Sequence, residues 1–292
     1  MTLRAKKPEA VTKRLKLFMF GPSGVGKTTA AVQFPRPYII DCERGTENYD
    51  KLITSVGGAV FGTVDCNEVL AEVKALLTEK HDYRSLVIDP ITPVYNDLLE
   101  KGEAKVGTDH GRHYGFADKY MRRLTNLLMA LDMNVVMTAH AKVEYGPNLA
   151  KLGLTFDGWK RLDYLFDLVV ELRKVGKGKA AKRVGVVVKT RLEGFPDSDE
   201  FPWSYEEIAK RYDAKVMERE SAVLSLASPA QVRQMKELLA LVRLPEGTVE
   251  KWFTKAGVEQ DVWEDMPADV IGKCIEYVKG RLPGGAAAGA VS

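Results

Sequence analysis

Short apolar runs alternate with segments of helical period between residues 15 and 212. Most of the runs are apolar at consecutive positions, which is typical of strands that are covered on both faces of a sheet. The segments between them include 67–80, where Asn67 is expected to cap the first turn, and 114–132. This alternation predicts an α/β fold with a mostly parallel central sheet. The six runs are 15–20, 37–41, 85–89, 134–139, 167–172 and 183–189.

A different pattern begins after residue 212. Ser228-Pro229 is a helix-start signal, and three short helical segments follow at 229–243, 247–256 and 267–281. Their apolar positions predict a small helical domain with a core of its own. The predicted organisation is a basic flexible arm at 1–14, an α/β core at 15–212, a linker at 213–228, a helical domain at 229–281 and a disordered tail at 282–292.

Composition excludes several classes of protein. The chain has 292 residues, 45% of them hydrophobic, yet it contains no apolar run of the roughly 18 residues that a membrane span requires. The basic amino-terminal segment lacks the apolar stretch of a secretory signal. The three cysteines form no C-x-x-C pair, which disfavours a disulfide scaffold and a cysteine-based zinc site. The net charge of +3 is too small to indicate a partner. These features predict a cytoplasmic protein without a membrane partner.

Residues 21–28 carry the clearest chemical motif. The sequence GPSGVGKT fits G-x-x-x-x-G-K-[ST] and lies between an apolar strand and a helical segment, as the motif requires. Glycines allow backbone amides to surround phosphates, Lys27 can reach the β- and γ-phosphates, and the Thr28 hydroxyl can ligate Mg²⁺. The expected nucleotide ligands are Gly21, Pro22, Ser23, Gly24, Val25, Gly26, Lys27, Thr28 and Thr29.

A second apolar strand ends in the acidic partner that such a loop needs. Asp89 closes SLVID and is expected to hold Mg²⁺ with Thr28, although it can also cap the helix that follows. No N/T-K-x-D element for reading guanine occurs, so the expected cofactors are ATP and Mg²⁺. Tyr49 is a residue that can stack on adenine.

The residue that polarises water must lie elsewhere, because Pro90 occupies the position where many ATPases place a glutamate. Glu43 follows the run 37–41, which we expect to neighbour the P-loop strand, so its carboxylate is placed to face the γ-phosphate. The alternative is a solvated loop residue beside Arg44.

In this order the motifs resemble those of RecA/RadA-type recombinase ATPases. They resemble more closely the phage nucleotide-binding proteins that carry only this core, some of which anneal single strands in recombination. The resemblance implies a RecA-like P-loop NTPase fold, with Glu43 as the catalytic glutamate. It covers about residues 15–200 and rests on GPSGVGKTT, IIDCERG, SLVIDP, NVVMTAH and VVVKTRLEGFP.

The same resemblance implies roles for three further residues. His140 takes the position of the γ-phosphate sensor, often Gln in the family, where a neutral histidine can donate one hydrogen bond. Lys189 and Arg191 match the Lys/Arg pair that reaches the nucleotide of the neighbouring subunit. This carry-over predicts a ring or filament with ATP sites between subunits. The alternatives are a loop histidine without a ligand and a solvated basic strand end.

Segments 101–113 and 141–160 correspond to the family's DNA-contacting loops, and residues 173–191 hold eight basic and no acidic residues. Phosphates require Lys or Arg, and unpaired bases stack on aromatic faces such as Tyr145, Phe156 and Trp159. A soluble hairpin turn is the alternative for the basic segment. The expected DNA-binding residues are Lys105, Arg112, Lys142, Tyr145, Lys151, Lys177, Lys179, Lys182 and Arg183.

Three functional hypotheses follow. The first is a Mg²⁺-dependent, DNA-stimulated ATPase that binds single-stranded DNA as an oligomer in phage recombination or annealing, in the host cytoplasm if the chain is phage-encoded. The second is a replication-accessory or helicase-loader ATPase, in which 229–281 docks a phage single-strand-binding or replication protein. The third is a nucleotide-dependent interaction switch without DNA binding.

Overall fold

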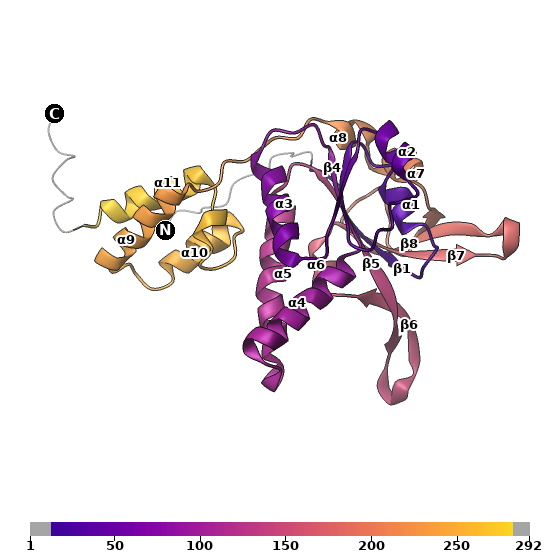
Figure 1. Cartoon of the computed structure of the whole chain (residues 1–292), viewed down its shortest axis with the longest axis horizontal. Coiled ribbons are helices and arrows are strands. Elements are labelled where there is room, and N and C mark those ends of the chain that lie inside the picture. Colours follow the sequence, from indigo (N-terminus) through magenta and orange to yellow (C-terminus); the bar gives the residue numbers. More distant parts are fainter. Residues whose placement is uncertain (1–12, 283–292) are drawn as a thin grey trace. The chain divides into compact units, whose positions relative to one another are not determined.

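The computed structural model describes residues 13–282, apart from the side chain of Lys179. Within that range nine strands form one sheet, and the predicted α/β class with a mostly parallel sheet is confirmed (Figure 1). All six predicted strands are present. The strands are β1 Lys16–Gly21, β2 Pro37–Asp41, β3 Ala59–Gly62, β4 Ser85–Asp89, β5 Asn134–Tyr145, β6 Lys151–Asp157, β7 Leu168–Val175, β8 Lys182–Thr190 and β9 Glu200–Pro202.

The order of strands in the sheet is β3-β2-β4-β5-β1-β7-β8-β9, and β6 pairs with β5. The strands from β3 to β7 in this order pair in parallel, whereas β6, β8 and β9 join as antiparallel neighbours. The expectation that 37–41 neighbours the P-loop strand is wrong, because β2 lies between β3 and β4. β5 and β7 take the two positions beside β1.

The helices begin and end close to the predicted positions. In α3 the N-cap is Asp65 rather than Asn67, since the Asp65 carboxylate accepts hydrogen bonds from the amides of Asn67 and Glu68. No helix in the described part of the chain is both long and apolar enough to cross a membrane. The α-helices are α1 Lys27–Ala31, α2 Asp50–Ser55, α3 Cys66–Thr78, α4 Ile91–Val106, α5 Arg112–Ala130, α6 Leu162–Leu165, α7 Tyr205–Tyr212, α8 Ala214–Glu218, α9 Pro229–Leu241, α10 Thr248–Ala256 and α11 Ala268–Lys279.

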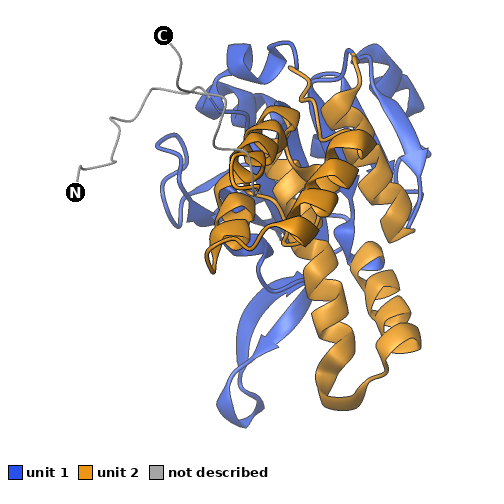
Figure 2. Ribbon diagram, turned by 90° about the vertical axis from the view of Figure 1, so that its left-hand side faces the viewer, with its two compact units in different colours: residues 1–64, 82–93, 132–221 blue, residues 65–81, 94–131, 222–292 orange. Residues whose placement is uncertain are grey.

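The chain divides into two compact units that each combine separate stretches of sequence (Figure 2). As far as they are described, residues 13–64, 82–93 and 132–221 form unit 1, which holds the whole sheet. Unit 2 holds α3, most of α4, α5 and the three carboxy-terminal helices. This division differs from the sequential order of the predicted domains, because α3 to α5 group with residues 222–282.

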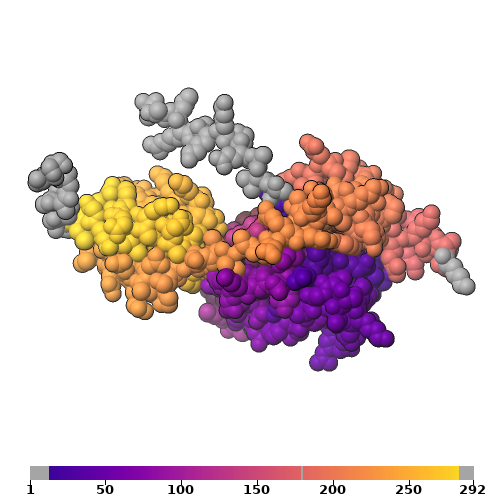
Figure 3. All heavy atoms as spheres, turned by 90° about the horizontal axis from the view of Figure 1, so that it is seen from above, coloured from indigo at the N-terminus to yellow at the C-terminus, as the bar shows by residue number. Residues whose placement is uncertain are grey.

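The three carboxy-terminal helices form a bundle with its own apolar core (Figure 3, orange to yellow). Phe253 and Met235 are fully buried there, and Trp263 packs against Phe253 with ring centroids 4.6 Å apart. Ser228 begins α9 with a capping box, its hydroxyl accepting from the amide of Gln231 while the Gln231 side chain accepts from the Ser228 amide. The predicted helix-start signal is thus confirmed.

The central strands of unit 1 are covered on both faces, as their consecutive apolar positions predicted. Every residue of β1 and of β4 is buried. Alternate side chains such as Leu17 and Met19 share a core with α1 and α7, where Ala31 and Ile208 are fully buried. This packing fixes the strand ends on which the polar residues of unit 1 lie.

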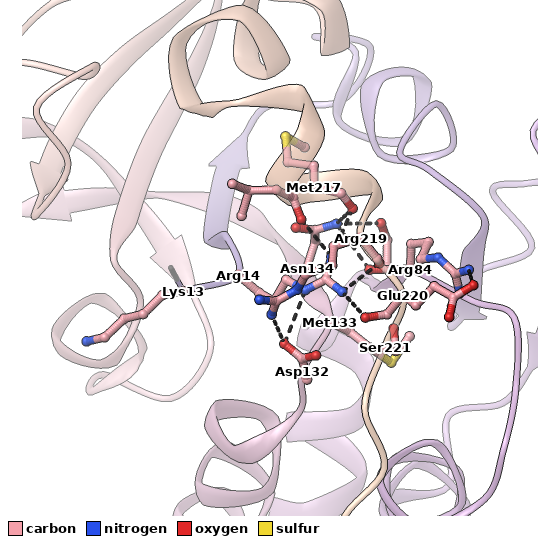
Figure 4. Close-up of polar contacts among 12 residues, drawn as sticks. Lys13, Arg14, Arg84, Asp132, Met133, Asn134, Met217, Arg219, Glu220 and Ser221 are labelled. Atoms are coloured by element: carbon pink, nitrogen blue, oxygen red, sulfur yellow. Dashed lines mark hydrogen bonds and ion pairs between the residues drawn. The ribbon is translucent and has the colours of Figure 1, made fainter. Parts of the chain in front are cut away.

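A buried arginine holds the amino end of β1. Arg14 is 3% exposed and donates to the carbonyls of four residues in 216–220 and to Asp132 Oδ1 at 3.2 Å (Figure 4). Asn134 adds a hydrogen bond of 2.8 Å to the Met217 carbonyl. Arg14 was expected at the end of a basic arm, of which residues 1–12 lie outside the described range. In the structure it fastens α8 and the residues that follow it to the sheet.

Candidate functional site

The P-loop leaves the carboxyl end of β1 and enters α1. Gly26, which precedes α1, has φ 96°, a left-handed conformation that favours glycine. At Gly21 a Cβ atom would lie 2.6 Å from the carbonyl oxygen of Leu172 on β7, so only glycine fits beside that strand. Both glycines of the motif therefore meet a steric requirement of the fold, and the loop takes the course that the motif predicted.

A cleft of about 560 Å³ opens at this loop, which is the size expected of a small-molecule site. It lies at the carboxyl ends of β1, β2 and β4 and beside the middle of β5, at the edge where open α/β sheets bind ligands. Two register pairs assemble it, because Gly21 is the neighbour of His140 and Asp41 is the neighbour of Asp89. The lining residues are Gly21, Pro22, Ser23, Gly24, Gly26, Lys27, Thr28, Thr29, Glu43, Gly45, Tyr49, Asp89, Pro90, His140, Ala141 and Arg183.

The predicted phosphate-binding lysine lies inside this cleft. Lys27 Nζ donates to the carbonyls of Gly21 at 2.7 Å and Pro22 at 3.0 Å, so the ammonium is held over the P-loop. Burial lowers the pKa of Lys27, while the negative charges of Asp89 and Glu43 raise it. An ammonium in this position is ready to bind a polyphosphate. Val25, also expected among the nucleotide ligands, is buried and does not line the cleft.

Asp89 and Thr28 meet as the sequence predicted. Thr28 Oγ1 donates to Asp89 Oδ2 at 2.6 Å, and Thr138 on β5 donates to Asp89 Oδ1. Asp89 is 4% exposed, and this burial raises its pKa although both hydroxyl hydrogen bonds lower it. Thr138 was not singled out from the sequence, because a threonine inside an apolar strand gives no distinct signal.

This pair of oxygen ligands fits Mg²⁺. Mg²⁺ prefers hard oxygen donors and usually completes its shell with water and substrate phosphates, so one carboxylate and one hydroxyl suffice from the protein. Within residues 13–282 no cluster of three or more His, Cys, Asp or Glu side chains is arranged to hold a metal ion. Thr28 and Asp89 would therefore hold the metal together with a bound triphosphate, and the metal would neutralise phosphate charge.

Glu43 reaches the cleft from the loop after β2. Its carboxylate lies 3.0 Å from His140 Nε2 and is 43% exposed, so it can accept a hydrogen bond from water in the cleft. The sequence placed Glu43 here through an expected pairing of β2 with β1 that does not occur. β2 instead lies beside β4, and the loop after β2 extends toward the P-loop.

The loop that carries Glu43 is shaped by Asp41, the last residue of β2. Asp41 Oδ1 accepts from the amides of Glu43 and Gly45, and Oδ2 accepts from the amide and hydroxyl of Thr46 at 2.9 and 2.5 Å. Burial raises the pKa of Asp41, but these hydrogen bonds lower it below its ordinary value. Sequence reasoning missed this role. An aspartate at a strand end before a turn is a signal that could have found it, since such side chains bind the amides that follow.

His140 lies where the resemblance placed a phosphate sensor. It is the neighbour of Gly21 across the β1–β5 pair, and its backbone amide donates to Thr92 Oγ1 at 3.0 Å. Its ring binds Glu43. His140 and Glu43 thus face the cleft as a hydrogen-bonded pair next to the P-loop.

Lys189 and Arg191 do not reach this cleft in the same chain. They lie at the end of β8 that adjoins the amino end of β7, while the P-loop follows the carboxyl end of β1, which runs parallel to β7. Lys189 Nζ donates to the carbonyls of Tyr164 and Phe166, and Arg191 donates to Tyr164 O at 2.8 Å. In this chain they brace the turn before β7. Their role at a neighbouring subunit's nucleotide stays a prediction.

Arg183, expected at a DNA surface, lines the nucleotide cleft. Its side chain lies over Gly26, where a Cβ atom would come within 2.8 Å of Arg183 Cδ. Trp203 Nε1 donates to the Gly26 carbonyl at 3.2 Å, and the Trp203 amide donates to the Arg183 carbonyl at 3.0 Å. β8 and the end of β9 therefore form a wall beside the P-loop that the sequence did not indicate.

The segment 101–113 is mostly helical rather than a loop. Lys105 lies in the last turn of α4 and Arg112 begins α5, both in unit 2 and both exposed. α4 continues to Val106, so only residues 107–111 connect the two helices. His113 is buried within α5 and stacks on Tyr114, with ring centroids 4.1 Å apart.

The segment 141–160 is largely a β-hairpin, formed by β5 and β6. Lys142, Tyr145 and Lys151 are exposed on it, whereas two of the expected stacking residues are not available. Trp159 is buried, and Phe156 packs edge-on against Phe18 at a centroid distance of 4.9 Å.

The basic segment 173–191 is a hairpin of β7 and β8, as one reading of the sequence proposed. Lys177 and Lys182 are exposed at or next to its tip. The side chain of Lys179 lies outside the described part of the chain.

The geometry supports binding of a Mg²⁺-polyphosphate and polarisation of water beside it. Lys27 and the loop amides would hold phosphate, Thr28 and Asp89 would hold the metal, and Glu43 is placed to accept a proton or hydrogen bond from water. Tyr49 also lines the cleft, and its hydroxyl lies 2.8 Å from Thr29 Oγ1.

Comparison with known proteins identifies the family of this chain. The chain has no match among curated proteins. A solved structure with a similar chain path is the KaiC-like protein of the hyperthermophilic archaeon Pyrococcus horikoshii, which is 18% identical over 64% of this chain and 83% of that one, with a TM-score of 0.40. The family model described as "AAA domain" matches residues 13–192. Because this match spans more than half of the chain and contains the P-loop, Glu43 and Asp89, the protein belongs to the AAA domain family and has the core of a P-loop ATPase.

Proposed function

We propose that this P-loop ATPase hydrolyses ATP with Mg²⁺, binds single-stranded DNA as an oligomer, and acts in phage DNA recombination or strand annealing. The observation that carries the proposal is that strands beside the nucleotide cleft continue into two hairpins, β5–β6 and β7–β8 (Figure 1). Exposed basic and aromatic side chains lie on these hairpins. A strand shared by both sites is a direct physical connection between nucleotide and DNA.

The β5–β6 hairpin supports base stacking. β5 passes His140 in the cleft and ends at Tyr145, whose side chain is 54% exposed. Lys151 is exposed and lies opposite Tyr145 in the strand register. An aromatic face next to a cation suits a single strand, because bases stack on the ring while the cation attracts the phosphate backbone.

The β7–β8 hairpin supports binding of phosphates. Lys177 is exposed at the tip, and Lys182 is exposed across the turn. Clustered cations attract a nucleic acid backbone without regard to its sequence, and the counterions released on binding make the affinity depend on salt.

The proposal of an oligomer depends on Lys189 and Arg191. Both are far along β8 from the cleft of their own chain, so they can act on a phosphate chain only in a neighbouring copy. A positive charge supplied across an interface would stabilise the charge that develops in phosphoryl transfer.

Anisotropy of a labelled single-stranded oligonucleotide, together with the ATPase rate, tests the DNA part at about 50 mM and about 200 mM salt. We expect DNA to stimulate hydrolysis at low salt and to lose this effect as salt rises. Lys151→Ala and Lys177→Ala should each lower the slope of log affinity against log salt by about 1. Lys51→Ala is the matched control, because Lys51 is an exposed lysine of α2, beside strands at the other edge of the sheet.

Absence of DNA binding at low salt, or an equal loss in Lys51→Ala and the hairpin variants, would overturn the DNA proposal and favour a nucleotide-dependent switch. Lys27→Ala should abolish ATP binding and with it any stimulation, which separates failure at the nucleotide site from failure at the hairpins.

Mixing two inactive variants tests the oligomer. Arg191→Ala retains an intact P-loop, and Lys27→Ala retains Arg191. If the site forms between subunits, the mixture regains ATPase activity because some interfaces combine both intact residues. A mixture as inactive as its components would show that Arg191 acts only within its own chain, where it braces Tyr164.

A further inference from the structure

The β7–β8 hairpin adds a second basic side chain to the P-loop lysine in the cleft. Of the described lining residues, Lys27 is the one lysine and Arg183 the one arginine. Asp89 and Glu43 contribute negative charge to the same cleft. A triphosphate brings up to four further negative charges, so one lysine and one Mg²⁺ leave a charge for another cation to balance.

Three features of the structure hold Arg183 beside the P-loop. Its aliphatic stem lies over Gly26, where it occupies the space that a side chain at Gly26 would fill. Trp203 binds both the Gly26 carbonyl and the Arg183 backbone, and so couples the P-loop to β8. The register of Arg183 with Lys174 on β7 fixes its height along the sheet. An exposed arginine with an anchored stem carries its guanidinium to a defined place.

Resting on ATP binding at the P-loop, we propose that Arg183 is a nucleotide-binding residue supplied by the same chain, and that its guanidinium contacts the phosphate tail of ATP. A guanidinium presents several donors in one plane and forms strong, charge-assisted hydrogen bonds with phosphate oxygens. This role differs from that of Lys189 and Arg191, which lie at the opposite end of β8 and are expected to act on a neighbouring copy.

Arg183→Met is the most informative variant. Methionine preserves much of the apolar stem over Gly26 and removes the guanidinium, with its charge and its hydrogen-bond donors, so a change in P-loop packing is kept small. Lys174→Ala is the matched control, because Lys174 is an exposed cation opposite Arg183 in the hairpin but does not line the cleft.

Calorimetric titration with Mg·ATP and with Mg·tripolyphosphate, which lacks base and ribose, tests the proposal. We expect Arg183→Met to weaken both ligands about tenfold or more, the loss typical of a hydrogen bond between charged groups. Lys174→Ala should bind both as the wild-type protein does.

Three results would overturn the proposal. Equal losses in Arg183→Met and Lys174→Ala would show that the positive charge of the whole hairpin attracts the phosphates, without a specific contact from Arg183. A loss for Mg·ATP with none for tripolyphosphate would place the guanidinium at the base or ribose. Unchanged ATP affinity with weaker DNA binding would return Arg183 to the DNA surface. Failure of the wild-type protein to bind Mg·ATP would instead refute the P-loop as a working nucleotide site, and is recognisable without any variant.

Discussion

The polar groups at the two ends of β1 differ in how far they are exposed to solvent. At the amino end, Arg14 is 3% exposed and makes five hydrogen bonds, four to backbone carbonyls and one to Asp132. At the carboxyl end, Glu43 and His140 are 43% and 42% exposed and face a cleft of about 560 Å³. The same strand therefore connects a polar cluster closed on itself with one that is open to a ligand.

The closed cluster is expected to contribute to the stability of the fold, and the open one to binding and catalysis. A buried cation whose donors are all used by the protein has nothing left for a ligand, and its removal leaves carbonyls without partners. Charged groups around a cleft keep donors and acceptors available, which is what binding and catalysis require. Substitutions at the two ends of β1 should therefore change different measured quantities.

The largest expected effect is at the open end. Glu43→Gln should lower the rate of ATP hydrolysis by about 10²- to 10⁴-fold, because an amide cannot accept the proton of the attacking water. ATP affinity and the free energy of unfolding should stay near the wild-type values, as measured by calorimetry and urea titration. Glu47→Gln, an exposed glutamate of the same loop outside the cleft, is the control. A Glu43→Gln protein that turns over at the wild-type rate would remove Glu43 from the mechanism.

At the closed end we expect a substitution to lower stability and to leave ATP binding intact. Arg14→Ala should lower the free energy of unfolding by about 3 kcal/mol or more, because it removes the donor of several buried acceptors. The folded fraction should still bind ATP. Arg219→Ala is the control, since Arg219 also pairs with Asp132 but is 47% exposed, and should cost under about 1 kcal/mol. Equal losses in the two variants, measured by urea titration, would contradict the distinction.

Asp41 sharpens the comparison, because it is a buried polar group at the open end. Asp41→Asn should lower the hydrolysis rate about 10- to 100-fold, since an amide NH₂ would face the Thr46 donors and displace the loop that carries Glu43. ATP affinity should change little. In the Glu43→Gln background the same substitution should have almost no further effect on rate. Additive losses would show that Asp41 acts independently of Glu43.

Lys16, next to the closed cluster, should make the free energy of unfolding depend on pH. Lys16 is 6% exposed, and burial lowers its pKa to about 7 while Asp167 and Asp132 raise it. Between about pH 7 and about pH 10 the unfolded chain therefore binds a proton that the folded chain does not, so this residue makes stability rise with pH. In Lys16→Met that contribution should disappear, as seen in urea titrations across this range. If the free energy of unfolding changes with pH in the same way in Lys16→Met and the wild type, Lys16 makes no such contribution.

Much of the fold follows directly from the pattern of the sequence. The strands were found because runs such as 85–89 hold consecutive apolar residues, here Leu86, Val87 and Ile88, and such runs have few alternatives to a covered strand. The P-loop was found because its glycines meet requirements of the backbone itself. Both features can be recognised from the sequence because the residues that define them are neighbours along the chain.

Features that depend on the pairing of distant segments were not predictable. The neighbours of β2 are set by the path of the whole sheet, so Glu43 was placed in the cleft by an argument whose strand order was wrong. Arg183 looked like one of many cations in a basic hairpin, and only its register with β7 and its contact with Gly26 distinguish it. Thr138 carries no signal at all until β5 lies beside β4.

The length of β5 has a consequence for how this protein can vary. Its 12 residues bind the Met217 carbonyl through Asn134, Asp89 through Thr138 and Glu43 through His140, before reaching Tyr145. Side chains alternate along a strand, so one inserted or deleted residue would turn everything beyond it to the other face. Natural relatives that keep this arrangement should therefore differ in length at the hairpin tip, 146–150, and hardly ever within 134–145.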